Sequence, residues 1–219
     1  MQTLQGNRKK CYICFRPESS CMCKHINSFG TNTKFVILMH PKEFKKVKNG
    51  TGHLTHLCLE NSKLFVGEDF TKHEEINNII STCRAFVLYP SKDALNISHN
   101  SLHVEDNTKD TAIFIIDSTW SCATSLLRKS KNIAKLPCIS FDSNKLSQFK
   151  IKEQPKDYCL STIESTLVLL ELLNKDKLEN ISQDNLDNFL NPFTEMIKYQ
   201  LSCVEKLSST KVRYKRNLK

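Results

Sequence analysis

Four cysteines stand close together near the start of the chain, in the pattern Cys11-x2-Cys14-x6-Cys21-x-Cys23. Thiolates at this density can form a tetrahedral Zn²⁺ site, and four of them leave no open coordination position, so the site would be structural. An iron–sulfur cluster is the alternative, because thiolates suit it too, and His25 lies close enough in sequence to replace one cysteine. The remaining interpretation, four unrelated thiols, is disfavoured by the clustering.

A second candidate group is Asp117-Ser118-Thr119-Trp120, which follows the most apolar stretch of the chain, residues 111–116. A carboxylate at the carboxyl end of a central parallel strand lies where α/β proteins bind their ligands. The helix predicted to follow would also offer backbone N–H groups to an anion. In the alternative interpretation, Asp117 caps that helix and Trp120 belongs to the core.

Three further motifs place polar groups at the ends of predicted elements. They are His40-Pro41-Lys42-Glu43 with Asn49-Gly50-Thr51-Gly52, then Leu88-Tyr89-Pro90-Ser91, and then residues 160–165. In the last of these, Ser161 and Glu164 fit a capping box. Taken singly, the first motif is better explained as a solvated basic loop and the last as a well-capped helix, whereas the second could hold a small ligand or be only a tight turn.

The segments that must position these motifs alternate between apolar strands and amphipathic helices. Strands are predicted at 34–39, 64–66, 85–89, 111–116 and 136–141, and helices at 54–59, 74–83, 119–131, 160–173 and from about 186 to 207, with a loop over 42–52 and a polar linker over 174–184. Strands that are apolar on both faces favour a mostly parallel sheet flanked by helices, the α/β class. We expect a cysteine-rich metal-binding segment over residues 1–30 and an α/β domain with a basic tail over 31–219.

The formal net charge of +9 favours a polyanionic partner such as RNA. The alternative is a basic surface that reflects only a composition rich in lysine. The candidate RNA contacts lie in two basic stretches and are His40, Lys42, Lys45, Lys46, Lys48, Arg213, Lys215 and Arg216.

The residues at the start of the chain, MQTLQGNRKKC, lack the apolar core of a signal peptide. No apolar run approaches the length of a membrane span. We therefore expect a cytoplasmic protein without a membrane partner, in which the ten cysteines are thiols or metal ligands.

Taken together, the motifs resemble those of the DTW-domain family. That family shows an N-terminal C-x2-C…C-x-C cluster, H-P-x-E followed by an N-T or N-x-T-G segment, a Y-P-S type turn, the D-x-T-W motif that names it, and an L-S-T-x-E helix start. This chain has all of them in that order, from Cys11 to Glu164. The name motif is commonly D-G-T-W or D-A-T-W, and here Ser118 keeps a small residue at its second place.

The resemblance implies a fold similar to the SPOUT-like RNA-modifying enzymes, with a trefoil knot near the C-terminal half that binds S-adenosylmethionine. The residues that it places around this cofactor are Leu88, Tyr89, Pro90, Ser91, Asp117, Ser118, Thr119, Leu160, Ser161 and Thr162. The implied reaction moves the 3-amino-3-carboxypropyl group to N3 of a tRNA uridine and releases methylthioadenosine. Asp117 would be the base or proton-orienting group, and Trp120 would stack on a base or on adenine. Two other functions remain open, an RNA methyltransferase and a non-catalytic zinc-containing RNA-binding module.

Overall fold

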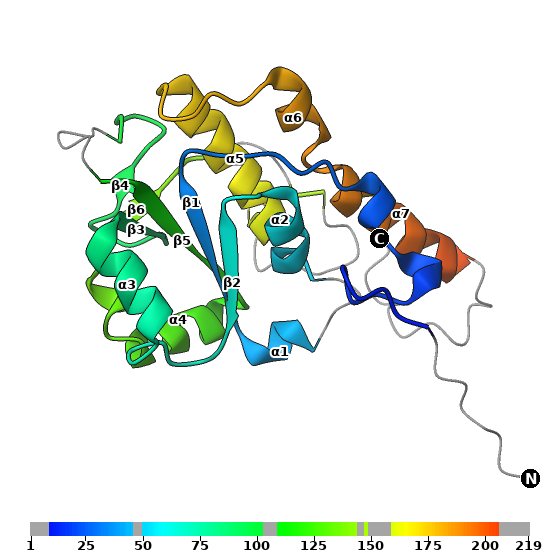
Figure 1. The fold of residues 1–219 in the computed structure, drawn as a ribbon, viewed down its shortest axis with the longest axis horizontal. Coiled ribbons are helices and arrows are strands. Elements are labelled where there is room, and N and C mark those ends of the chain that lie inside the picture. Colours follow the sequence, from blue (N-terminus) through cyan, green and yellow to red (C-terminus); the bar gives the residue numbers. More distant parts are fainter. Residues whose placement is uncertain (1–8, 46–49, 103–108, 144–146, 149–158, 206–219) are drawn as a thin grey trace, which may run out of the picture.

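The computed structural model describes residues 9–45, 50–102, 109–143, 147–148 and 159–205. These residues form a six-stranded sheet in the order β2-β1-β5-β3-β6-β4, and each neighbouring pair is parallel (Figure 1). The strands are β1 (Lys34–Met39), β2 (Ser62–Val66), β3 (Arg84–Leu88), β4 (Leu95–Asn96), β5 (Thr111–Asp117) and β6 (Cys138–Ser140). The predicted α/β class with a parallel sheet is confirmed.

Helices cover both faces of the sheet. They are α1 (Pro41–Phe44), α2 (Gly52–Cys58), α3 (Glu74–Thr82), α4 (Trp120–Lys129), α5 (Thr162–Lys175), α6 (Gln183–Asn188) and α7 (Asn191–Glu205), with short 3-10 turns η1 (Glu18–Ser20), η2 (Cys23–His25) and η4 (Ile133–Lys135). Apolar residues of α3 and α4 form a core cluster on one face, and those of α2, α5, α6 and α7 form the other.

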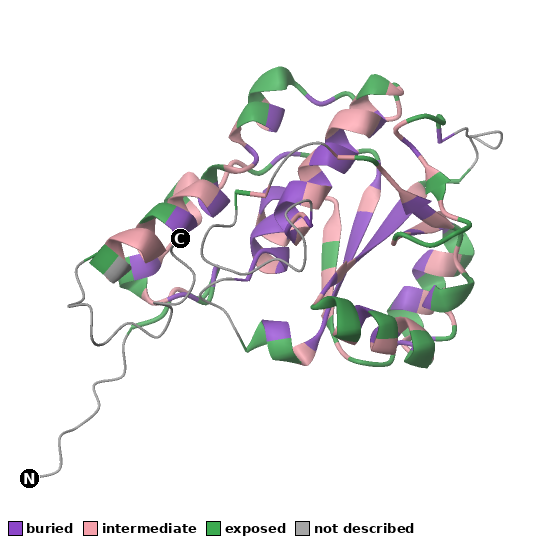
Figure 2. Ribbon diagram, turned by 180° about the vertical axis from the view of Figure 1, so that it is seen from behind, coloured by how far each residue is buried: buried purple, intermediate pink, exposed green. Residues whose placement is uncertain are grey.

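The central strands explain this layering. Along β1, Phe35 belongs to the cluster beneath α2 and α5, whereas Val36 and Leu38 belong to the cluster beneath α3 and α4. Successive side chains of a strand point to opposite faces, so a strand buried on both sides must be apolar throughout. Figure 2 shows the buried residues gathered in these strands and along α5.

The structure differs from the sequence prediction in three elements. The last helix is two helices, because Pro192 lies in the first turn of α7, a position where its missing N–H costs nothing, whereas inside one long helix it would break the backbone ladder. The segment predicted as a loop over 42–52 contains most of α1, which begins at Pro41, and the first residue of α2, Gly52. The short edge strand β4 was not predicted, since two residues carry no periodicity.

Two further expectations concern the whole chain. The trefoil knot stays a prediction, because residues 144–146 and 149–158 lie outside the described residues. Among the described residues, no helix combines the length and the apolar character that crossing a membrane requires.

Candidate functional site

Asp117 is the last residue of β5 and its side chain is buried, with 6% of its surface exposed. Its Oδ1 accepts a hydrogen bond of 2.6 Å from Oγ1 of Thr162, the first residue of α5. The backbone also joins it to the neighbouring strand, since the His40 N–H donates to the Asp117 carbonyl at 3.1 Å. The capping interpretation of Asp117 is wrong, because Thr119 is the N-cap residue of α4 and Asp117 belongs to the strand.

Gly52 closes the other side of the carboxylate. A Cβ atom built on this glycine would lie 2.5 Å from both Cγ and Oδ2 of Asp117, closer than real Cβ contacts allow. The first turn of α2 can therefore approach Asp117 only without a side chain at this position. The N-x-T-G, D-S-T-W and L-S-T-x-E motifs thus meet at one buried carboxylate.

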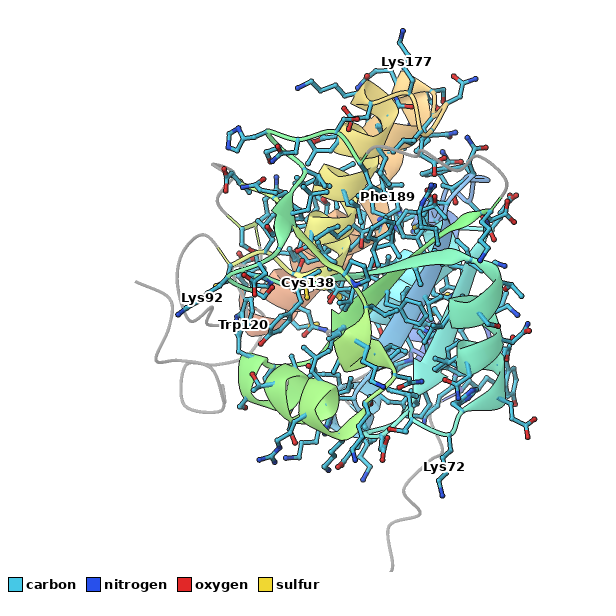
Figure 3. All side chains as sticks on the ribbon, turned by 90° about the vertical axis from the view of Figure 1, so that its left-hand side faces the viewer. Lys72, Lys92, Trp120, Cys138, Lys177 and Phe189 are labelled. Carbon is cyan, nitrogen blue, oxygen red and sulfur yellow. The ribbon has the colours of Figure 1, made fainter. Side chains whose placement is uncertain are left out.

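Trp120 begins α4 with 46% of its surface exposed, so the interpretation that placed it in the core is wrong. Its ring lies 6.3 Å from that of Tyr89 at an angle of 56°, and the Tyr89 hydroxyl lies 3.2 Å from Oγ1 of Thr124. In Figure 3, Trp120 lies at the start of α4 on the same side of the view as Lys92, which follows the Tyr89 turn. The exposed Trp120 ring, beside the partly buried Tyr89, is available to a planar ligand at this end of the sheet.

The predicted cofactor residues fall into three groups. Leu88 ends β3 next to β5, so the turn through Tyr89, Pro90 and Ser91 lies at the same end of the sheet as Ser118 and Thr119. Leu160 and Ser161 precede Thr162, whose hydroxyl reaches Asp117. The contacts that the structure gives therefore join the α5 start to Asp117, and Tyr89 to Trp120.

The capping box predicted at the start of α5 is present. Oε2 of Glu164 accepts from the Ser161 N–H at 2.8 Å and from the Ser147 hydroxyl at 2.9 Å, and Oε1 accepts from the Gln148 N–H at 2.6 Å. Glu164 is 6% exposed, and its bond to the Ser161 N–H is buried, whereas those to Ser147 and Gln148 are partly buried. They fix the α5 start, and with it the Thr162 hydroxyl that holds Asp117.

The predicted RNA contacts are placed only in part. Lys42 and Lys45 are exposed at α1. His40 is 5% exposed, its Nδ1 accepts from the Lys42 N–H at 3.1 Å, and its Nε2 lies 3.6 Å from Oε1 of Glu68. Both ring nitrogens thus have protein partners, and the RNA-binding role of His40 stays a prediction. The others, Lys46, Lys48, Arg213, Lys215 and Arg216, lie outside the described residues.

The four cysteines of the N-terminal cluster come together as predicted. Sγ of Cys11 lies 3.5 Å from Sγ of Cys23, Sγ of Cys14 lies 3.7 Å from Sγ of Cys21, and all four sulfurs lie within 4.8 Å of one another. A tetrahedral zinc ion with Zn–S bonds of about 2.3 Å requires sulfurs about 3.8 Å apart, so the thiols fit it. His25 is not part of this group among the described residues.

Hydrogen bonding and burial act differently on these thiols. Backbone N–H groups of Cys14 and Ile13 lower the pKa of Cys11 to about 6. Burial and the neighbouring thiols raise the pKa of Cys23. A cation bound by the four sulfurs would remove the mutual repulsion of the thiolates, which suits a metal centre.

Arg16 joins the cysteine cluster to the rest of the protein. Its side chain is 2% exposed, and Nη2 donates to the Gly50 carbonyl at 3.2 Å and contacts Sδ of Met196 in α7 at 3.1 Å. Burial lowers the pKa of Arg16, whereas the thiolates of Cys14, Cys21 and Cys23 raise it, so the guanidinium lies within their electrostatic reach. Sequence reasoning missed this residue, although an arginine inside a four-thiolate motif is a visible counter-charge.

The turn between Cys11 and Arg16, which we call the knuckle, exposes apolar side chains. Tyr12, Ile13 and Phe15 are 91%, 60% and 45% exposed. Phe15 has φ = 56°, a left-handed conformation that costs a non-glycine residue about 1 kcal/mol. Its ring lies 5.1 Å from that of His53, and Nε2 of His53 lies 3.0 Å from the Ile13 carbonyl. The knuckle therefore contacts α2 at His53, the residue that follows Gly52.

Comparison with known proteins places the chain among its relatives. The model of one protein family, described as the DTW domain, matches residues 8–201. A protein of Macaca fascicularis named tRNA-uridine aminocarboxypropyltransferase 2 is 29% identical over 200 residues, which cover 89% of this chain and 64% of that protein. The protein of the same name from Mus musculus is 29% identical over 202 residues, again covering 89% and 64%.

A more distant organism gives the same result. The protein of that name from Drosophila melanogaster is 28% identical over 204 residues, which cover 90% of this chain and 76% of that protein. The chain spans slightly less than two thirds of the length of the two mammalian relatives. No solved structure matches the chain significantly.

Proposed function

The chain belongs to the DTW domain family, and from that premise we propose that it is a tRNA-uridine aminocarboxypropyltransferase. In this proposal it transfers the 3-amino-3-carboxypropyl group of S-adenosylmethionine to N3 of a tRNA uridine and releases methylthioadenosine. The names of the relatives support the proposal. The observation that carries it is the buried carboxylate of Asp117 at the carboxyl end of a central strand, where Gly52 and Thr162 of two other motifs contact it.

S-adenosylmethionine supplies a sulfonium-activated carbon, and N3 bonds to that carbon as the carbon–sulfur bond breaks and the electron pair stays on sulfur. The uridine N3 also carries a proton that must leave. Asp117 is the group that we assign to receive or orient this proton, with Thr162 fixing the carboxylate by its hydrogen bond. Trp120 is exposed beside Tyr89, which suits stacking on a base or on adenine.

The cofactor residues proposed are the strand end and turn Leu88, Tyr89, Pro90 and Ser91, together with Ser118, Thr119, Leu160, Ser161 and Thr162. Their support is positional, because the carboxyl ends of β3 and β5 are neighbours and α5 starts beside Asp117. In a parallel sheet this edge is where the connections open a ligand site.

The tRNA contacts proposed include Lys42 and Lys45, which are exposed at α1 directly after the β1 end that pairs with Asp117. Phosphates attract such side chains without regard to sequence. We also propose a cytoplasmic protein, made of a metal-binding segment over residues 1–30 and a catalytic domain over 31–219. All ten cysteines lie in the described residues and none forms a disulfide there, which supports a reducing compartment.

The reaction is tested by its products. Purified protein incubated with tRNA and S-adenosylmethionine is expected to yield methylthioadenosine and a uridine heavier by one aminocarboxypropyl group, as read by mass spectrometry of the nucleosides. S-adenosylhomocysteine with a methylated uridine would overturn the proposal in favour of an RNA methyltransferase. Binding of tRNA without calorimetric binding of S-adenosylmethionine would indicate a non-catalytic RNA-binding module.

The metal that we propose at the cysteine cluster is zinc in a structural role. Freshly purified, reduced protein is expected to carry about one zinc ion per chain. Cys14→Ser should lose the metal and lower the melting temperature by at least about 5 °C, because a structural ion contributes its binding free energy to folding. Elemental analysis and thermal unfolding measure the two effects.

The matched control for the zinc prediction is Cys138→Ser, since Cys138 is a partly exposed thiol of β6 outside the cluster. Its metal content should equal that of the wild type. If the same analysis finds iron and inorganic sulfide instead of zinc, the site is an iron–sulfur cluster. A reduced protein that contains neither metal would refute the metal site.

A further inference from the structure

The knuckle exposes more apolar surface than a structural metal site needs. Of the seven large hydrophobic side chains that the described residues leave exposed, three are Tyr12, Ile13 and Phe15. Exposed apolar groups that gather at one place usually mark a contact surface. Of the four proposed metal ligands, Cys14 is buried and the other three are partly exposed.

Phe15 holds its position at a cost to the backbone. Its left-handed φ of 56° is a conformation that glycine adopts freely, so glycine would serve the turn better. The phenyl ring is half exposed and does not fill the core. Because Phe15 occupies a position where the backbone favours glycine, its ring itself is expected to have a role.

The knuckle is also placed and fixed with respect to the Asp117 site. The Phe15 ring packs on His53, and the preceding residue, Gly52, lies directly against the Asp117 carboxylate. Arg16 attaches the same turn to the Gly50 carbonyl and to α7. The Phe15 ring therefore lies at the margin of the proposed site, in a turn that contacts His53 and that Arg16 anchors.

The charges near the rings indicate which class of ligand binds to them. Lys9 and Lys10 are exposed immediately before the knuckle, in a chain of net charge +9. Aromatic rings beside cationic side chains suit single-stranded nucleic acid, because bases stack on the rings while phosphates meet the cations. An apolar protein partner would gain nothing from the two lysines.

We infer that Tyr12 and Phe15 form a stacking surface for nucleotides of the tRNA that flank the target uridine. This inference rests on the proposed function for the identity of the RNA. It adds to the site a contact that binds the bases next to the reacting one, whereas Lys42 and Lys45 meet the phosphates. The surface acts on RNA affinity and leaves the chemistry to Asp117.

Two substitutions test the stacking surface. Phe15→Gly removes the ring and keeps the turn, and Tyr12→Ser removes a ring that is 91% exposed. Each should weaken tRNA binding by about five- to a hundredfold, the range for losing one base–aromatic stack. Binding is measured with the tRNA and with a single-stranded oligonucleotide of the target uridine and its neighbours. Tyr12→Trp should retain the wild-type affinity.

The controls separate stacking from folding. Phe15→Gly should not lower the melting temperature, because it relieves the left-handed strain, and metal content and S-adenosylmethionine affinity should stay unchanged. Leu95→Ser removes an apolar side chain that is 39% exposed on β4, at the opposite edge of the sheet from β2, and should leave RNA affinity unchanged.

Because binding is read without turnover, this test is independent of the product analysis. Wild-type affinity in both ring variants would overturn the inference and leave the proposed reaction intact. Unchanged RNA affinity together with a loss of self-association or of another protein contact would assign the surface to a protein instead. A protein that transfers no aminocarboxypropyl group, but loses RNA affinity with the rings, would overturn the reaction and retain the surface.

Discussion

Replacing Asp117 with asparagine is expected to lower the transfer rate by about a hundredfold or more, the usual effect of losing a general base. Asparagine keeps the shape of the side chain and an oxygen that can accept the hydrogen bond from Thr162. It removes the charge and the basicity that the N3 proton requires. Single-turnover formation of methylthioadenosine with saturating tRNA measures the rate of the chemical step.

The affinity for S-adenosylmethionine distinguishes the roles that Asp117 could have. If the carboxylate acts on the nucleophile, this affinity changes much less than the rate. Asp110→Asn is the matched control, since Asp110 is exposed just before the other end of β5 and should keep full activity. Near-normal turnover in Asp117→Asn would refute the catalytic role, and lost cofactor binding would make Asp117 a ligand contact.

Gly52→Ala is expected to reduce the transfer rate by roughly tenfold to a hundredfold, because the added methyl group cannot fit. Its carbon would lie 2.5 Å from the Asp117 carboxyl carbon, so the carboxylate or the α2 start must move. Displacements of about 1 Å at a reacting group can cost about a hundredfold in rate. Alanine otherwise favours a helix over glycine by up to about 1 kcal/mol, so the loss is not one of helix propensity.

Gly30→Ala is the control for this substitution, because a Cβ there meets only Oε2 of Glu60, at an ordinary 3.7 Å. It should leave rate and stability close to those of the wild type. Combined with Asp117→Asn, Gly52→Ala should lower the rate much less than it does alone, since both changes act on one group. Equal effects of Gly52→Ala in both backgrounds would show that it acts elsewhere.

The strands were the most predictable part of the fold. The structure has β1 with the predicted bounds, and β5 differs only by including Asp117. Both have apolar side chains on both faces over residues 35–39 and 112–116, which is a signal that a single sequence carries. That additional residue is Asp117, and its place at the end of the strand, rather than at the cap of α4, puts its carboxylate in the candidate site.

Contacts between distant residues were not predictable in the same way. The approach of Gly52 to Asp117, and the hydrogen bond from Thr162 to Asp117, depend on how strands and helices pack, and no local periodicity encodes them. The motifs carried the resemblance to a family, but not the reason that the glycine is required. Similarly, the exposure of Trp120 follows from which side of α4 faces the sheet, and an aromatic residue alone does not determine it.

The contact of Arg16 with Met196 has a consequence for synthesis of the chain. The two residues are 180 positions apart, so a ribosome needs on the order of 10 to 40 s to make the second after the first. The cysteines are local in sequence and can bind their metal as soon as Cys23 has emerged. If the proposed metal binds at this stage, the turn would already be loaded before α7 is made and Arg16 can contact Met196. Loading of the proposed metal and docking of the turn on α7 would therefore be separate events in time, whereas the Gly50 carbonyl lies only 34 residues from Arg16 and is made much earlier.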